Sequence, residues 1–203
     1  MIRVIFILFF VAGLHAQEVK NPYKFEFGAC YGWGKEFDNY DYTFSNSYVQ
    51  LQFYYSFNPE KKWEYQVALM PEINFAQHQL LNKYFVTPDD PEYERKRNEY
   101  TKLKDVRQVI LNVAFFLRYN VCDNFSVYTM GNVGPMFNDA ETERLNRGFA
   151  FNDVFAVGAV VSFYDITFDV RPGVAHVSNA GLYESNAGFN TYNISFGLIV
   201  PIE

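Results

Sequence analysis

A histidine and a serine stand two residues apart near the C-terminal end of the chain. His176 and Ser178 follow the alternating apolar segment 166–174 and precede a polar stretch that runs to Gly188. A histidine can take the proton of a serine hydroxyl, which then attacks an ester carbonyl. Residues two apart on a strand lie roughly 7 Å apart at Cα, and a histidine ring covers most of that gap. The pair is a candidate for acyl transfer, or else two solvated residues at a loop end.

Strand parity indicates where these side chains point. His176 and Ser178 share even numbering with the apolar residues of segment 166–174, and Asn190 shares it with Tyr192 and the apolar residues after it. Residues of equal parity lie on the same face of a strand. We therefore expect all three polar side chains on the apolar outer face of one sheet, at the ends of two adjacent antiparallel strands.

Eight segments alternate apolar and polar residues with a period of two, as strands with one apolar face do. Long polar connections at 34–46, 77–105, 138–148 and after Ser178 alternate with short turns at 58–62, 120–124 and 164–165. The connection 77–105 is read as an exposed loop, and a hairpin extension or a short helix within it is left open. An even strand number and alternating loop lengths are typical of outer-membrane barrels, whose long loops are external. The predicted strands are 23–32, 49–57, 63–75, 107–119, 125–136, 153–163, 166–178 and 192–202.

Composition supports an all-β, eight-stranded antiparallel transmembrane barrel. The chain has 16 Tyr and 22 Phe, yet its mean hydropathy is −0.16 and no helix-length apolar run follows residue 16. The net charge of −6 gives no basic surface for nucleic acid. Charged residues at inward positions are expected to form a polar network that fills the barrel. These residues are Glu64, Glu72, Arg118, Asp169 and Arg171.

The N-terminal segment 1–16 reads as a secretory signal peptide, with Arg3 before an apolar core and Ala16 at the cut. Residues 17–203 then form a single barrel domain. Cys30 and Cys122 are expected to lie too far apart for a disulfide. No metal-ligand cluster is apparent, because His78 has no Cys or His neighbour in the sequence, so neither a metal nor another cofactor is predicted.

The run HVSNAGL at 176–182, with Asn186, Gly188 and a strand ending near residue 202, resembles the C-terminal signature of the PagL-type lipid A 3-O-deacylases. The motif covers about the last 28 residues. The resemblance implies an outer-membrane serine esterase without cofactor, whose partner is lipid A (lipopolysaccharide) in the outer leaflet and whose site lies on the external, lipid-facing wall. It assigns Ser178 as nucleophile and His176 as general base, and it leaves a homodimer open. Asn179, Gly181 and Asn186 fall at positions of the oxyanion region.

The third position of the predicted triad departs from the family pattern. The family has a glutamate fourteen residues after the histidine, where this chain has Asn190. An asparagine oxygen can orient the imidazole but carries no charge to stabilise the imidazolium. Glu184 is either a substitute acid or a solvated loop residue.

Two other features leave alternatives open. The cations at 95–97 either meet lipid A phosphates or are simply solvated. The competing functions are a catalytically silent barrel of the same fold with a lipid-binding or envelope role, and an adhesin-like barrel whose external loops bind a partner.

Overall fold

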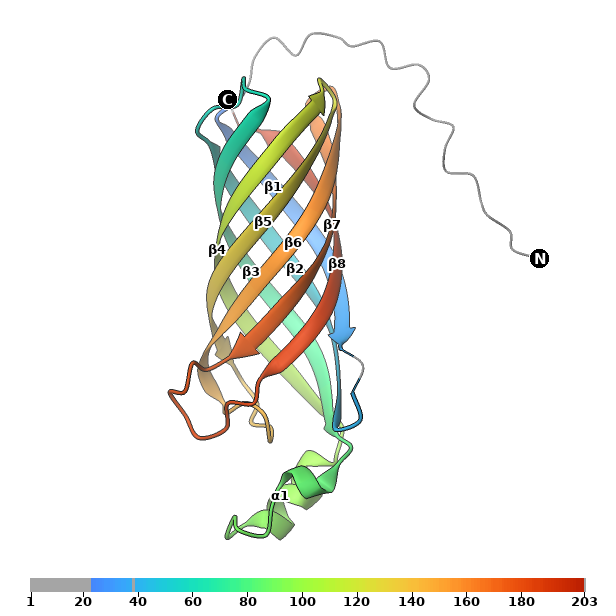
Figure 1. The fold of residues 1–203 in the computed structure, drawn as a ribbon, viewed down its shortest axis with the longest axis vertical. Helices are drawn as coiled ribbons and strands as arrows, with labels where there is room; N and C mark the ends of the chain where they lie inside the picture. Colours follow the sequence, from blue (N-terminus) through green and yellow to red (C-terminus); the bar gives the residue numbers. More distant parts are fainter. Residues whose placement is uncertain (1–22, 38, 203) are drawn as a thin grey trace, which may run out of the picture.

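Eight antiparallel strands close into a barrel in the computed structural model, which describes residues 23–37 and 39–202 (Figure 1). Each strand pairs with the next along the chain, and β8 pairs with β1. The predicted eight-stranded antiparallel barrel is confirmed, whereas the expected signal peptide lies outside the described residues. The strands are β1 (Phe25–Glu36), β2 (Tyr42–Ser56), β3 (Trp63–Leu80), β4 (Lys104–Cys122), β5 (Phe125–Asn138), β6 (Gly148–Phe163), β7 (Ile166–Ser178) and β8 (Phe189–Pro201).

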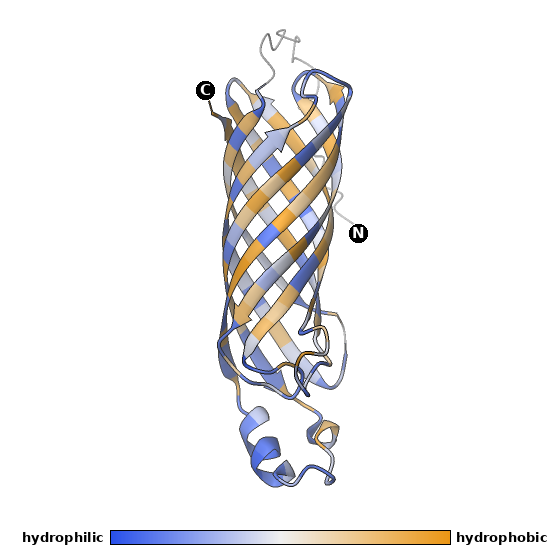
Figure 2. Ribbon diagram, turned by 90° about the vertical axis from the view of Figure 1, so that its left-hand side faces the viewer, coloured by the Kyte–Doolittle hydropathy of each residue, from blue (hydrophilic) through white to orange (hydrophobic). Residues whose placement is uncertain are grey.

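The outer wall is apolar because the alternating residues face outward as the parity predicts. In β3, Leu69 and Ile73 are exposed while their neighbours Met70 and Glu72 are buried. Figure 2 shows the same alternation as hydrophobic and hydrophilic segments along each strand. An outward apolar band over a filled interior suits a barrel surrounded by lipid. Among the described residues, no helix is long and apolar enough to cross a membrane.

Polar clusters and buried apolar residues together pack the lumen, and the charged residues predicted to face inward belong to the polar clusters. The guanidinium of Arg171 donates to Asp169 at 2.7 Å and to the Tyr128 hydroxyl at 2.7 Å. Glu72 accepts hydrogen bonds from Gln50 and Asn112. Arg118 forms a third cluster with Glu26 and Glu64, each 4.0 Å away. Inward-facing residues such as Gln50, Glu72 and Asn132 line a cavity of about 50 Å³, and side chains fill most of the interior of a barrel of eight strands.

Several strands extend further than their apolar pattern indicates. The loop predicted at 34–46 shrinks to 37–41, because Gly34 pairs with Asn46 and Lys35 with Ser45. Backbone pairing continues beyond the apolar band, where outward side chains no longer need to suit lipid. The connection predicted as an exposed loop at 77–105 is shorter, because β3 continues to Leu80 and β4 begins at Lys104. It also contains short helical segments, η1 (Lys83–Phe85) and α1 (Tyr93–Tyr100).

The three cations at 95–97 bind partners within this connection. Arg95 pairs with Glu92 and Glu99, and Lys96 pairs with Asp90. The guanidinium of Arg97 donates to a backbone carbonyl of the same connection. These contacts favour a structural role over phosphate binding. Cys30 and Cys122 are both free thiols, as expected.

Candidate active site

His176 lies near the end of β7 on the outer wall, on the side of the barrel where the long loops emerge, away from the C-terminus (Figure 1). In the sheet it is directly opposite Asn190 of β8 and Asp153 of β6. All three residues are exposed. His176 Nδ1 lies 2.8 Å from Asn190 Oδ1. Because an amide oxygen only accepts, Nδ1 carries the proton and Nε2 is left as the basic nitrogen.

Ser178 is the last residue of β7 and is half-buried. Its position in the sheet is opposite Phe151 of β6. Within the described part of the chain, no hydrogen bond joins the Ser178 hydroxyl to His176. Hydrogen bonds between catalytic groups are often long before substrate binds and shorten in the complex. The structure thus places both residues on one wall, two positions apart, without pairing them.

The site loop (residues 179–188) is held by its own asparagines. The backbone N–H of Asn179 donates to Asn186 Oδ1 at 2.7 Å, and the Asn179 side chain donates to the Ser185 carbonyl at 2.8 Å. The Gly181 N–H donates to Asn179 Oδ1 at 3.0 Å. Two of the three predicted oxyanion residues therefore use these donors inside the loop. Ala180 has a φ of 53°, a left-handed conformation that strains a non-glycine residue.

A second loop, the brace loop (residues 139–147), packs against the site loop. The Arg144 guanidinium donates to the Gly188 carbonyl at 2.6 Å and to the Ala187 carbonyl at 3.3 Å. The Gly188 N–H in turn donates to the Arg144 carbonyl at 2.9 Å. An isolated bridge joins Leu145 to Asn186. These contacts fix the site loop from outside its own strands.

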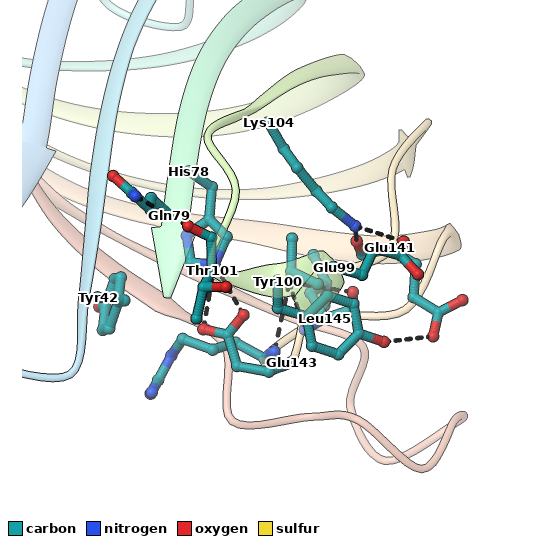
Figure 3. Close-up of polar contacts among 12 residues, drawn as sticks. Tyr42, His78, Gln79, Glu99, Tyr100, Thr101, Lys104, Glu141, Glu143 and Leu145 are labelled. Atoms are coloured by element: carbon teal, nitrogen blue, oxygen red, sulfur yellow. Dashed lines mark hydrogen bonds and ion pairs between the residues drawn. The ribbon is translucent and has the colours of Figure 1, made fainter. Parts of the chain in front are cut away.

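The brace loop is anchored in the barrel mouth and on the helical connection (Figure 3). Glu143 reaches the fully buried His78, whose Nε2 lies 2.9 Å from Glu143 Oε2. On the other side, Tyr100 donates to the Glu141 carboxylate and Lys104 to the Glu141 carbonyl. Hydrogen bonds therefore link α1 and the start of β4 to the brace loop, and the brace loop to the site loop.

Apolar side chains surround the site on the outer wall. Phe155 of β6, Val174 of β7 and Tyr192 of β8 are exposed and lie opposite one another in adjacent strands. This row is two residues from His176, toward the middle of the barrel. Phe151 faces outward beside Ser178 and packs against Phe149 with ring centroids 5.0 Å apart. A fatty acyl chain lying along this wall would contact apolar surface up to the serine.

Sequence reasoning missed two residues of this region and left one alternative open. Asp153 shares its parity with outward Phe155, so a lipid-facing carboxylate could have been recognised from the pattern. Arg144 gave no signal, because its contacts depend on the shapes of two loops. Glu184 is exposed in the site loop, and among the described residues no hydrogen bond joins it to His176. The described residues also contain no group of three or more His, Cys, Asp and Glu side chains arranged to hold a metal ion.

Comparisons with known proteins agree with this architecture. The family model for lipid A 3-O-deacylase (PagL) matches residues 23–198. The barrel is similar to the crystal structure of the outer membrane enzyme PagL, with a TM-score of 0.50 and 12% identity, over 86% of this chain and 99% of that one. It is also similar to Neisserial surface protein A, with a TM-score of 0.53 and 9% identity, over 88% of this chain and 97% of that one.

The two kinds of comparison carry different weight. At such low identity, the structural similarities show the fold alone. No curated protein sequence matches the chain. The family match covers most of the sequence, including the strand and loop that carry His176 and Ser178. The chain therefore belongs to the lipid A 3-O-deacylase (PagL) family of the bacterial outer membrane.

Proposed function

We propose that this barrel is a serine esterase that hydrolyses an ester-linked fatty acyl chain of lipid A in the outer leaflet. The observation that carries the mechanism is the 2.8 Å contact between His176 Nδ1 and Asn190 Oδ1 on the outer wall. It selects the imidazole tautomer whose Nε2 can accept a proton. Family membership supplies the substrate class, and the exposed apolar wall suits an acyl chain that stays in the membrane.

The reaction proceeds through an acyl-enzyme. Ser178 Oγ bonds to the ester carbonyl carbon while its proton passes to His176 Nε2. The imidazolium returns that proton to the sugar oxygen as the carbon–oxygen ester bond breaks, which leaves the fatty acyl group on Ser178. A water molecule then gives a proton to His176 Nε2 and attacks the acyl carbon, and the imidazolium returns that proton to Ser178 Oγ as the bond between Oγ and the acyl carbon breaks. The products are a free fatty acid and the regenerated serine.

The site loop supplies one donor for the negative charge that develops on the carbonyl oxygen. Asn179 and Gly181 already donate within the loop, so we assign them to holding its shape. Asn186 uses its side-chain oxygen to accept from Asn179, while the residue itself is exposed. Its amide nitrogen is therefore the donor that we assign to the oxyanion.

Mass spectrometry of lipid A from cells with and without the protein tests the proposal. We expect the wild-type protein to remove one acyl chain and Ser178→Ala to leave lipid A intact, with both barrels folded. Ser185→Ala is the matched control, because it removes a hydroxyl from the same loop and should retain deacylation. If lipid A stays intact with the wild-type protein, the alternative of a silent barrel with a lipid-binding, envelope or adhesin-like role takes its place.

A further inference from the structure

One carboxylate of the outer wall, that of Asp153, lies beside the candidate site. Asp153 is exposed on β6, among side chains that face lipid. Within the described chain, no hydrogen bond or ion pair engages its carboxylate. A charged side chain in a lipid-facing row destabilises a barrel, although less near the interface than at the midplane. An ionisable residue that persists in such a place is a candidate functional group.

The barrel places this carboxylate beside the imidazole. Asp153 and His176 are directly opposed in the β6–β7 pairing, which runs without a register shift from Phe163↔Ile166 to Phe151↔Ser178. Directly opposed residues have Cβ atoms about 4.5–5.5 Å apart. Both side chains face outward. On the other side of His176, the opposed residue is Asn190.

The two neighbours of His176 offer complementary properties. Asn190 accepts the Nδ1 hydrogen bond and so orients the ring, but its amide is neutral. The imidazolium that forms when Ser178 attacks then has no negative partner on that side. Asp153 carries a negative charge in the adjoining strand. At this distance its carboxylate attracts the His176 imidazolium without a direct hydrogen bond.

We infer that Asp153 is a positioning residue that supplies the negative charge for the His176 imidazolium, while Asn190 supplies the orienting hydrogen bond. The two functions that a single triad carboxylate combines are thus divided between residues on opposite sides of the histidine. This inference rests on the proposed hydrolysis at Ser178. It adds a role for β6 that the hydrolysis itself does not require.

The refolded full-length barrel, assayed for fatty acid release from lipid A in detergent micelles, tests the inference. Asp153→Asn keeps the size of the side chain and removes the charge, so we expect kcat to fall on the order of tenfold with little change in KM. Asp153→Glu restores the charge and should recover most of the rate. Asp105→Asn, which removes an outward carboxylate from β4, is the matched control and should behave as wild type.

A second background separates an electrostatic role from a structural one. In Asn190→Glu, the orienting residue itself carries a charge, so Asp153→Asn should then lower kcat by much less than in the wild-type barrel. Equal losses in both backgrounds, or a rise in KM at constant kcat, would overturn the inference. Its failure is distinguishable from that of the proposed function, because an active wild type with an inactive Ser178→Ala and an unaffected Asp153→Asn refutes only the role of Asp153.

Discussion

Replacing Gly188 with alanine should disable the site while leaving the barrel folded. Gly188 has a φ of 66°, and a Cβ built on it would lie 2.3 Å from the Val177 carbonyl oxygen. That oxygen belongs to the backbone of β7 and cannot move aside. The same Cβ would lie 3.5 Å from Cε1 of His176, so the residue also borders the imidazole.

The size of the effect follows from two contributions. A left-handed conformation costs a non-glycine residue about 1–2 kcal/mol. Relief of the collision requires the backbone at Gly188 to move, which breaks the hydrogen bond to its carbonyl from the charged Arg144 side chain, worth about 1.5–3 kcal/mol. We therefore expect about 2.5–5 kcal/mol of local destabilisation, confined to the site loop. A displacement of about 1 Å at a catalytic group lowers turnover on the order of a hundredfold.

The assay combines fatty acid release from lipid A with the heat-dependent gel mobility that distinguishes folded from unfolded barrels. Gly131→Ala is the matched control, because a Cβ there has no neighbour within 4 Å. Gly188→Ala should show folded mobility and a rate reduced on the order of a hundredfold. A folded variant that keeps its rate within a few-fold of wild type would refute the reasoning, because the backbone at Gly188 would then be free to move without disturbing the histidine.

Three further outcomes can be measured. Asn190→Glu should raise the rate by about tenfold in the same assay, because a charge-assisted hydrogen bond is roughly twice as strong as a neutral one. A fall in the rate to that of Asn190→Ala would instead show that the amide is specifically required. Arg171→Ala should destabilise the barrel by about 3–5 kcal/mol in urea unfolding, because it leaves Asp169 buried without its cation, and a much smaller loss would mean that water replaces the cation. A hydrogen bond from Lys96 lowers the pKa of Asp90, so the helical connection gains stability above the ordinary carboxyl range and loses it as pH falls through the lowered value. Proteolysis within residues 81–103 should therefore increase below about pH 4 while the strands stay protected, and cleavage independent of pH would contradict this.

The strands were predictable because lipid outside and packed polar groups inside impose opposite demands on alternate residues. Val174 and Tyr192 face outward as their parity predicts, and Arg171 faces inward. The errors lie at strand ends such as Gly34 and Ser45, where pairing continues through residues that no longer contact lipid. The apolar alternation extends only over the part of a strand that faces lipid. Beyond that part, backbone hydrogen bonds continue the strand without an apolar pattern.

The candidate site was predictable only in part, for a related reason. Parity places His176 and Asn190 on the outer wall, but it does not set which residues stand opposite each other. The site loop is long enough to allow several registers between β7 and β8, so their hydrogen bond could not be derived from spacing. The contacts of Arg144 depend on two loops folding against each other, and loops of this kind carry no periodic signal.

The pairing of Asp153 with His176 is set by a much shorter connection, the turn between β6 and β7. Tyr164 and Asp165 are the only residues between β6 and β7, and Tyr164 adopts the left-handed conformation, with a φ of 54°, that tight hairpins use. A two-residue turn fixes the register of the whole hairpin. The turn at 164–165 therefore places Asp153 opposite His176, although the turn and this pair lie at opposite ends of the hairpin. An insertion of one residue in that turn would bring an inward neighbour of Asp153 opposite the histidine unless a bulge absorbed it. The geometry of the site at the external surface is thus set in part by a turn at the opposite end of the same hairpin.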